Sequence, residues 1–287
     1  MPLQIIPFYK NMGETPLSAL GRLRTEKSEY QYLPLTYAGR LDPLAEGLLI
    51  ILAGDECMKK DEYTALPKEY EVKVLFGFAT DTYDVLGIVN DLEMQRRDIV
   101  PETAFDTLLP SPRIFSCWKI SLLEPSLCER VPGAICLHSV SETLQNNFVG
   151  DIEQAYPPYS SRTVEGKPLF QWAREGRLGE IEIPKHKVHV ESIEIKKVET
   201  ITKEKLHKYI NSAIDSVKGD FRQDEILEKW EETFIAETSN EYQVVTLTIN
   251  CGSGTYVRSI ANDLGNLLGV PALALHIKRT KIGDLKI

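Results

Sequence analysis

Two segments that lie far apart in the chain alternate between apolar and polar residues along their length. Residues 68–76 place Tyr70, Val72 and Val74 on one side, and residues 241–251 repeat the pattern. Side chains of a strand point alternately to opposite faces, so each segment predicts a half-buried β-strand. Strands and helices do not alternate regularly elsewhere in the sequence. This favours an α+β fold with antiparallel pairs over a doubly wound sheet.

Local signals predict further elements. Thr15 followed by Pro16 is typical of a helix start, with an N-cap residue and a proline in the first turn. Gly176 and Gly269 are suited to end helices, because glycine adopts the left-handed conformation found there. We therefore predict a buried strand at 47–53 and helices at 16–24, 167–175, 203–217 and 255–268.

The chain has 287 residues, of which 43% are hydrophobic, a length that suits one large or two modest domains. Its longest apolar run, residues 48–53, is far shorter than a membrane helix requires. No signal peptide is visible at the start, so we expect a cytoplasmic protein and not a membrane or secreted one. The 5 cysteines form no C-x-x-C pair, and no metal site is expected.

Charge is unevenly distributed. The formal net charge is -9, yet residues 191–241 alone hold 13 acidic and 8 basic residues. Residues 251–287 hold 5 basic and 2 acidic residues. Because salt screens charges beyond roughly 8 Å, an acidic segment on one face does not repel a polyanion on another. The total charge therefore does not exclude an RNA partner.

Asp42 is the residue whose surroundings most suggest chemistry. It stands in the segment GRLDPLAEG, residues 39–47. Pro43 restricts Asp42 to extended backbone, and the flanking glycines Gly39 and Gly47 allow tight turns. A carboxylate fixed in this way can act as a nucleophile, although Asp-Pro alone is also an ordinary turn.

The segment around Asp42 resembles the catalytic motif of the TruB-type tRNA pseudouridine synthases. Further segments agree with this family in the same order: 10–15, 68–70 with 77–87, 148–176, and 252–280. The resemblance implies a pseudouridine synthase-like catalytic domain with a mixed, mostly antiparallel central sheet flanked by helices and loops. It also implies that 1–287 is one such domain, without the C-terminal RNA-binding (PUA-type) domain of longer relatives.

Two stretches extend beyond the family's shorter core. They lie at about 92–138 and 198–240, and we expect both to be insertions. The second contains the predicted amphipathic helix at 203–217 and much of the acidic charge. We therefore expect it to be a peripheral addition that lies away from the RNA.

The resemblance implies that the protein isomerises uridine to pseudouridine in tRNA, at uridine 55 of the T-arm. It implies no cofactor, metal or guide RNA, and we expect a monomer. Asp42 would be the nucleophile, attacking either the ribose or the uracil ring. Arg258 would pair with Asp42, and Tyr70 would stack on a base flipped out of the RNA. The implied substrate contacts are Tyr37, Arg40, Asp84, Tyr256, Ile277, Arg162, Lys278 and Arg279.

Several of these residues also fit structural roles when taken singly. Tyr70 and Ile277 could be core residues, and Asp84 could cap a turn. Arg258 could lie along the surface, and the basic stretch with Lys278 could simply be solvated.

Two departures from the family pattern bear on function. Tyr37 stands where the family has a histidine, and Ser253 where it commonly has a lysine before the motif G-T-Y-[IV]-R. Thr163 also replaces a usual basic residue, which Arg162 could offset. These changes motivate an alternative, a non-catalytic RNA-binding protein or tRNA-folding chaperone on the same scaffold. A guide-dependent synthase and an aspartate-dependent hydrolase are weaker alternatives.

Overall fold

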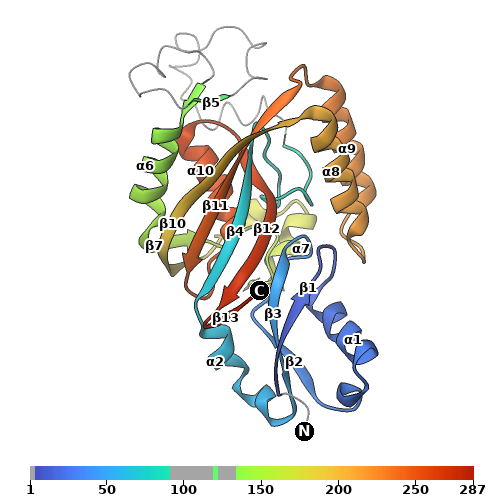
Figure 1. Cartoon of the computed structure of the whole chain (residues 1–287). Coiled ribbons are helices and arrows are strands. Elements are labelled where there is room, and N and C mark those ends of the chain that lie inside the picture. The colour runs from blue at the N-terminus through green and yellow to red at the C-terminus, as the bar shows by residue number, and fades with distance from the viewer. Residues whose placement is uncertain (1–3, 91–118, 122–133) are drawn as a thin grey trace.

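The computed structural model describes residues 4–90, 119–121 and 134–287, and a nine-stranded sheet runs through them (Figure 1). The order is β1-β3-β12-β4-β11-β10-β7, with β2 paired to β3 and β13 to β12. Every pairing in this sheet is antiparallel except β3 with β12. The strands are β1 (Ile5–Lys10), β2 (Leu35–Ala38), β3 (Glu46–Ala53), β4 (Lys68–Phe76), β7 (Gly150–Ala155), β10 (Lys185–Thr202), β11 (Glu241–Cys251), β12 (Ala272–Ile282) and β13 (Leu285–Lys286). The predicted α+β fold with a mixed, mostly antiparallel sheet is thus confirmed.

The remaining elements surround this sheet. Two small pairs stand apart from it: β5 (Lys119–Ser121) with β6 (Ala134–Cys136), and β8 (Thr163–Val164) with β9 (Lys167–Pro168). The α-helices are α1 (Pro16–Glu26), α2 (Lys60–Ala65), α6 (Leu137–Phe148), α7 (Leu169–Arg174), α8 (Lys203–Ser216), α9 (Gln223–Ala236) and α10 (Val257–Leu268). Short 3-10 turns occupy Ser28–Tyr30, Gly54–Lys59 and Leu178–Glu180.

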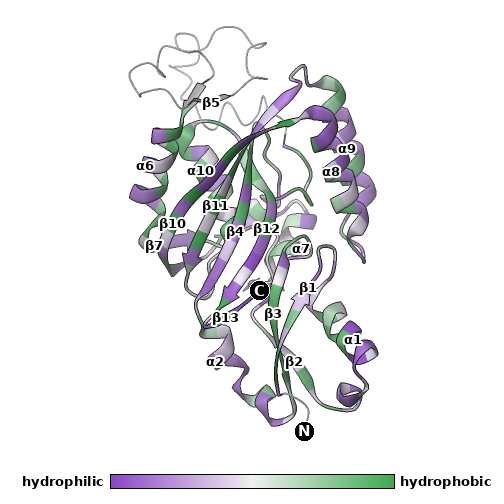
Figure 2. Ribbon diagram, viewed as in Figure 1, coloured by the Kyte–Doolittle hydropathy of each residue, from purple (hydrophilic) through white to green (hydrophobic). Residues whose placement is uncertain are grey.

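Helices cover both faces of the sheet. On one face, α6 and α10 pack against alternate residues of β4 and β11, including Val72, Val74 and Leu247. On the other face, α8 and α9 pack against Leu75 of β4 and Val244 of β11. Figure 2 shows hydrophilic and hydrophobic residues side by side on α8 and α9, as expected of amphipathic helices. The alternation that predicted β4 therefore separates two hydrophobic cores.

The N-terminal part of the chain builds a smaller extension of the sheet. The apolar run of β3 is buried on both faces, with Leu49 and Ile51 packed against α1 and the neighbouring Leu48 and Ile50 packed on the other side. The first turn of α1 is closed by a capping box between Thr15 and Ser18, which confirms the predicted start.

Most predicted elements are confirmed, with shifts at their starts. The helix at 203–217 corresponds to α8, and the strand at 47–53 to β3. The helix predicted at 167–175 starts two residues later, because Lys167 and Pro168 form β9. The insertion expected at 92–138 lies mostly outside the described residues.

Candidate active site

Asp42 lies in the loop that joins β2 to β3. The loop turns tightly, since the Ala45 amide donates to the Asp42 carbonyl oxygen at 3.1 Å. β3 follows at Glu46, and its second residue, Gly47, has a φ of 110° and faces β12. A Cβ atom at Gly47 would lie 2.3 Å from the carbonyl oxygen of Arg279, so only glycine fits at this close approach.

Two buried cations hold the loop from opposite ends. Arg279 donates through Nε to the Leu48 carbonyl oxygen at 2.7 Å, and its Nη atoms reach the carbonyl oxygens of Gly39 and Arg40 at 3.3 and 3.2 Å. Lys10 donates through Nζ to the carbonyl oxygens of residues 11, 43 and 45. Burial lowers the pKa of Lys10 to about 8. The backbone on both sides of Asp42 is therefore fixed by side chains from β1 and β12.

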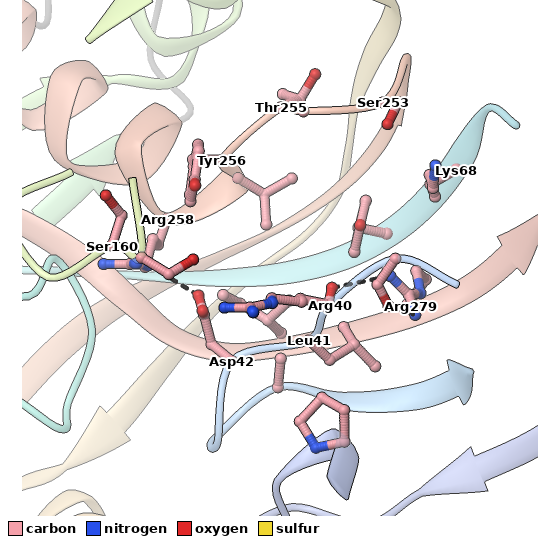
Figure 3. A pocket seen from close by; sticks show the side chains of 18 of the residues that line it. Arg40, Leu41, Asp42, Lys68, Ser160, Ser253, Thr255, Tyr256, Arg258 and Arg279 are labelled. Atoms are coloured by element: carbon pink, nitrogen blue, oxygen red, sulfur yellow. Dashed lines mark hydrogen bonds and ion pairs between the residues drawn. The ribbon is translucent and has the colours of Figure 1, made fainter. Parts of the chain in front are cut away.

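Arg258, in the first turn of α10, forms an ion pair with Asp42. Its Nε donates to Asp42 Oδ2 at 2.8 Å, and the two side chains are 3% and 38% exposed. Burial lowers the pKa of Arg258, but the charges of Asp42 and Asp84 outweigh burial and leave the pKa raised. Figure 3 shows the two side chains meeting beside Ser160. One carboxylate oxygen is thus held by a buried cation while the side chain remains accessible.

A cavity of about 510 Å³ opens beside this ion pair and contains most of the sequence-predicted site residues. Its walls come from the 37–45 loop, β4, the 156–161 segment, the 252–258 segment and β12. The predicted residues that line it are Tyr37, Arg40, Asp42, Tyr70, Tyr256, Arg258, Ile277 and Arg279. The structure therefore brings together residues from segments that are far apart in the sequence.

Tyr70 points to the face of the sheet that α10 covers, and it forms part of the cavity wall. It is 8% exposed, and burial raises the pKa of its hydroxyl. The side chain is consequently a neutral phenol at pH 7. A flat, neutral ring at a cavity wall is suited to stacking on a base.

The cavity is basic although the chain is acidic. Its charged lining residues are four cations, Arg40, Lys68, Arg258 and Arg279, and one anion, Asp42. A polyanion can therefore enter a region of positive potential.

A second cavity of about 420 Å³ adjoins the first and shares Asp42, Arg258 and Ser160 with it. Asp84 lines this second cavity and not the first. Burial raises the pKa of Asp84 to about 6, and its Oδ1 accepts hydrogen bonds from Thr82 Oγ1 and the Leu86 amide at 2.8 and 3.0 Å. Asp84 thus shapes a turn, as its structural alternative predicted, and also borders the site.

The α8–α9 turn, residues 217–222, contradicts one expectation. The second insertion was expected to be peripheral, yet Asp220, Phe221 and Arg222 line the second cavity together with Asp42. The buried face of the two helices explains this placement. Because α8 and α9 pack on the central strands, with Trp230 fully buried, their connecting turn is carried to the site.

Three predicted substrate contacts lie elsewhere or serve another purpose. Arg162 is exposed, with its guanidinium 5.1 Å from the Tyr156 ring, and borders neither cavity. Lys278 also borders neither cavity, and its Nζ lies 5.9 Å from the Tyr9 ring. Arg279 is 1% exposed, and its donors are used by carbonyl oxygens. A substrate contact by Arg279 stays a prediction, because its side chain lines the first cavity while its Nε and Nη atoms donate to backbone carbonyl oxygens.

Other residues of the site had no role assigned from the sequence. Lys68 lines the first cavity, and burial lowers its pKa to about 8. Its position two residues before Tyr70 in the K-x-Y motif could have indicated this. Gln154 accepts from the Tyr256 amide and donates to the Tyr256 carbonyl oxygen, at 2.8 and 3.1 Å. His186 stacks on Tyr156 with ring centroids 4.1 Å apart, a contact that no motif indicated.

Two kinds of feature are absent from the described residues. Within these residues, no helix combines the length and apolarity needed to cross a membrane. The same part of the chain holds no group of three or more His, Cys, Asp or Glu side chains placed to bind a metal ion.

Comparisons with known proteins agree with this geometry. Two relatives named tRNA pseudouridine synthase B align over 99% of the chain, one from Ligilactobacillus salivarius at 26% identity and one from Bacteroides thetaiotaomicron at 24%. The alignments cover 68% and 87% of those relatives. A solved chain in a Cbf5-Nop10-Gar1 complex shares the fold, with a TM-score of 0.50 and 15% identity over 98% of this chain and 49% of that one.

A family model covers most of the chain. The model described as TruB family pseudouridylate synthase (N terminal domain) matches residues 27–111 and 131–224. The match includes Asp42 and Tyr70 but ends before Arg258, so the structure supplies the pairing of Asp42 with Arg258 independently. With the motif order, the mixed sheet and the Asp42 loop in agreement with this match, the chain belongs to the TruB family of pseudouridylate synthases.

Proposed function

We propose that the protein isomerises uridine to pseudouridine in tRNA, at uridine 55 of the T-arm. The ion pair between Asp42 and Arg258, set in a cavity lined by cations, is the observation that carries this proposal. Family membership and the relatives named tRNA pseudouridine synthase B support the tRNA substrate. We further propose that the enzyme acts in the cytoplasm as a monomer without guide RNA.

Asp42 is the proposed nucleophile. The reaction breaks the bond between uracil N1 and ribose C1′, rotates the uracil, and forms a bond between C5 and C1′, after which C5 loses its proton. The Asp42 side chain is 38% exposed in the cavity, while Arg258 Nε holds one of its oxygens at 2.8 Å. The carboxylate held in this way attacks either the ribose or the uracil ring.

Tyr70, Ile277 and Tyr256 are proposed to receive the uracil. A base inside a folded stem-loop must be flipped out before chemistry, at a cost of a few kcal/mol. Stacking on an aromatic ring is worth roughly 1–3 kcal/mol per base and offsets much of that cost. Tyr70 and Ile277 lie on neighbouring strands β4 and β12 and are 8% and 6% exposed, which supports a dry pocket for the ring.

One alternative is binding without catalysis. Tyr37 and Ser253, the two departures from the family pattern, both line the first cavity and therefore bear on substrate contacts. The intact pairing of Asp42 with Arg258 favours the catalytic function, because a protein that only binds RNA has no need for a buried cation on an accessible carboxylate.

Tritium release from a tRNA transcript labelled at uridine C5 tests the proposal. Wild type is expected to release one equivalent, and Asp42→Asn none, because an amide is a poor nucleophile. Asn is nearly isosteric with Asp, so circular dichroism and tRNA binding of the variant should match wild type. Turnover by Asp42→Asn would contradict the role of Asp42, and binding without release by wild type would favour the RNA-binding alternative.

A further inference from the structure

Arg222, in the α8–α9 turn, is bound to the segment that precedes Asp84. Its Nη1 lies 2.9 Å from Asp81 Oδ2 and its Nη2 lies 3.4 Å from Asp81 Oδ1. The two side chains are only 16% and 28% exposed. Arg222 also has a φ of 65°, a left-handed conformation that residues other than glycine adopt at a cost. In this conformation the guanidinium points toward Asp81 and Tyr159.

The same pair holds the segment on the other side of Asp42. The Arg222 guanidinium carbon lies 4.3 Å from the ring centroid of Tyr159. The pKa of the Tyr159 hydroxyl is raised, first by burial and then by the charge of Asp81 and a hydrogen bond to it. Arg222, Asp81 and Tyr159 therefore form one cluster that joins three segments of the chain.

This cluster borders the two backbone carbonyls that orient the catalytic arginine. Arg258 donates through Nη1 to the carbonyl oxygen of Thr82 at 2.6 Å and through Nη2 to that of Tyr159 at 3.0 Å. Thr82 directly follows Asp81, and Tyr159 is itself in the cluster. The third donor group of Arg258, Nε, is the one that holds Asp42.

A second contact ties the end of α8 to the Asp42 loop. The Lys218 amide donates to the Gly13 carbonyl oxygen at 3.4 Å, and the Gly13 amide donates to the Pro43 carbonyl oxygen at 2.9 Å. A Cβ atom at Gly13 would lie 2.2 Å from the Ser216 carbonyl oxygen, so the two segments are in close backbone contact. The α8–α9 segment thus contacts the backbone on both sides of Asp42.

We propose that Arg222 is a positioning residue for the catalytic ion pair, and that the α8–α9 turn fixes the orientation of Arg258. This inference rests on the proposed function of Asp42 and Arg258. The Arg222–Asp81 pair clamps the 81–82 and 159 segments against each other, and their carbonyls fix the plane of the Arg258 guanidinium. Without the clamp, Arg258 still faces Asp42, but the carboxylate is aimed less accurately at the flipped nucleotide.

The test compares Arg222→Gln with Lys229→Gln, which removes the same charge from an ion pair with Glu232 on α9, away from both cavities. Single-turnover tritium release at saturating enzyme is expected to slow about 10- to 100-fold in Arg222→Gln, because small misplacements of a reacting group cost this much. The dissociation constant for tRNA should stay within about twofold of wild type, and the control should match wild type in both. Asp81→Asn combined with Arg222→Gln should be no slower than either single variant, because the two residues act as a unit.

Hydrogen exchange supplies a readout that needs neither RNA nor activity. Amide exchange in residues 80–86 and 156–161 should rise in Arg222→Gln and not in Lys229→Gln.

If wild type releases tritium and Arg222→Gln matches the control in rate and exchange, the positioning role is wrong. If tRNA affinity falls while the saturated rate is unchanged, Arg222 contacts substrate instead. If wild type releases no tritium, the proposed function fails, and exchange alone decides whether the clamp exists. Should Arg222→Gln not fold, Arg222→Lys, which keeps the charge but loses the planar contact with Tyr159, is expected to give an intermediate rate.

Discussion

Lys10 and Arg279 are buried cations whose charge is balanced by backbone carbonyls. Among the described residues neither forms an ion pair, and both are 1% exposed or less. Their donors are satisfied by carbonyl oxygens on either side of Asp42. A change in the backbone of this loop would leave the buried charges without their carbonyl partners. We therefore expect the loop to be rigid.

Replacing Arg279 tests that link. Arg279→Met keeps an unbranched apolar side chain but removes the donors to three carbonyl oxygens, so we expect the free energy of unfolding to fall by about 3 kcal/mol. Tritium release should fall as well, because the Asp42 loop is loosened. Urea denaturation and single-turnover assays measure the two effects.

Lys278→Met is the matched control for Arg279→Met. Lys278 lies next to Arg279 on β12 and borders neither cavity, so its replacement should change unfolding by less than about 0.5 kcal/mol. If the stability of Arg279→Met is unchanged and its RNA binding is weaker and less salt-dependent, Arg279 contacts phosphate and does not hold the loop.

The elements that sequence patterns predict best are those whose burial is one-sided. β4 and α8 have one face toward a core and one toward solvent or a second layer. The alternation of β4 and the helical spacing of apolar residues in α8 can therefore be recognised in the sequence. β12 is different, because its second half carries the basic residues Lys278, Arg279 and Lys281, which suggest an exposed segment although Arg279 is 1% exposed. The burial of Arg279 depends on β3 and β4 closing around that strand, which no local pattern contains.

The site shows the same division. Asp42, Tyr70 and Arg258 belong to segments that match the family's motifs, and all three line the first cavity. The clamp of Arg222 and Asp81 joins residues 141 positions apart. Its contact depends on how α8 and α9 pack, so the sequence alone could not predict it.

At the scale of elements, α9 should behave as part of the core. Trp230 is fully buried, packs against Phe78 in a tilted arrangement with ring centroids 5.4 Å apart, and donates from Nε1 to the Val85 carbonyl oxygen at 3.2 Å. Trp230→Ala is expected to lower the free energy of unfolding by about 3–5 kcal/mol. Ile235→Ala, at a position 76% exposed on the same helix, should change it little. A small effect of Trp230→Ala on global unfolding would indicate an independently unfolding appendage.

At the scale of the whole molecule, acidic and basic residues are unevenly distributed. The chain carries a net charge of -9, yet the first cavity is lined by four cations and one anion. Ser253 lies exposed at this cavity, where the family commonly has a lysine. Ser253→Lys is expected to tighten RNA binding and to steepen the dependence of log K on log salt by about 0.7–0.9, the value for one added phosphate contact.

A charge added elsewhere provides the control. Ser28→Lys makes the same change in net charge at an exposed position outside both cavities, and it should leave the salt slope unchanged. Equal slopes for the two variants would mean that RNA responds to overall charge and not to this cavity. Titrations at several salt concentrations distinguish the cases.

The position of β12 has a consequence for synthesis of the protein. β3 and β4 are consecutive in the sheet's chain order, but β12 lies between them and joins them. A nascent chain on the ribosome therefore holds two unconnected half-sheets until residues 272–282 have emerged. Arg279, which anchors the Asp42 loop, arrives with that same strand. We therefore expect closure of the sheet and anchoring of the Asp42 loop to occur together, because both require β12.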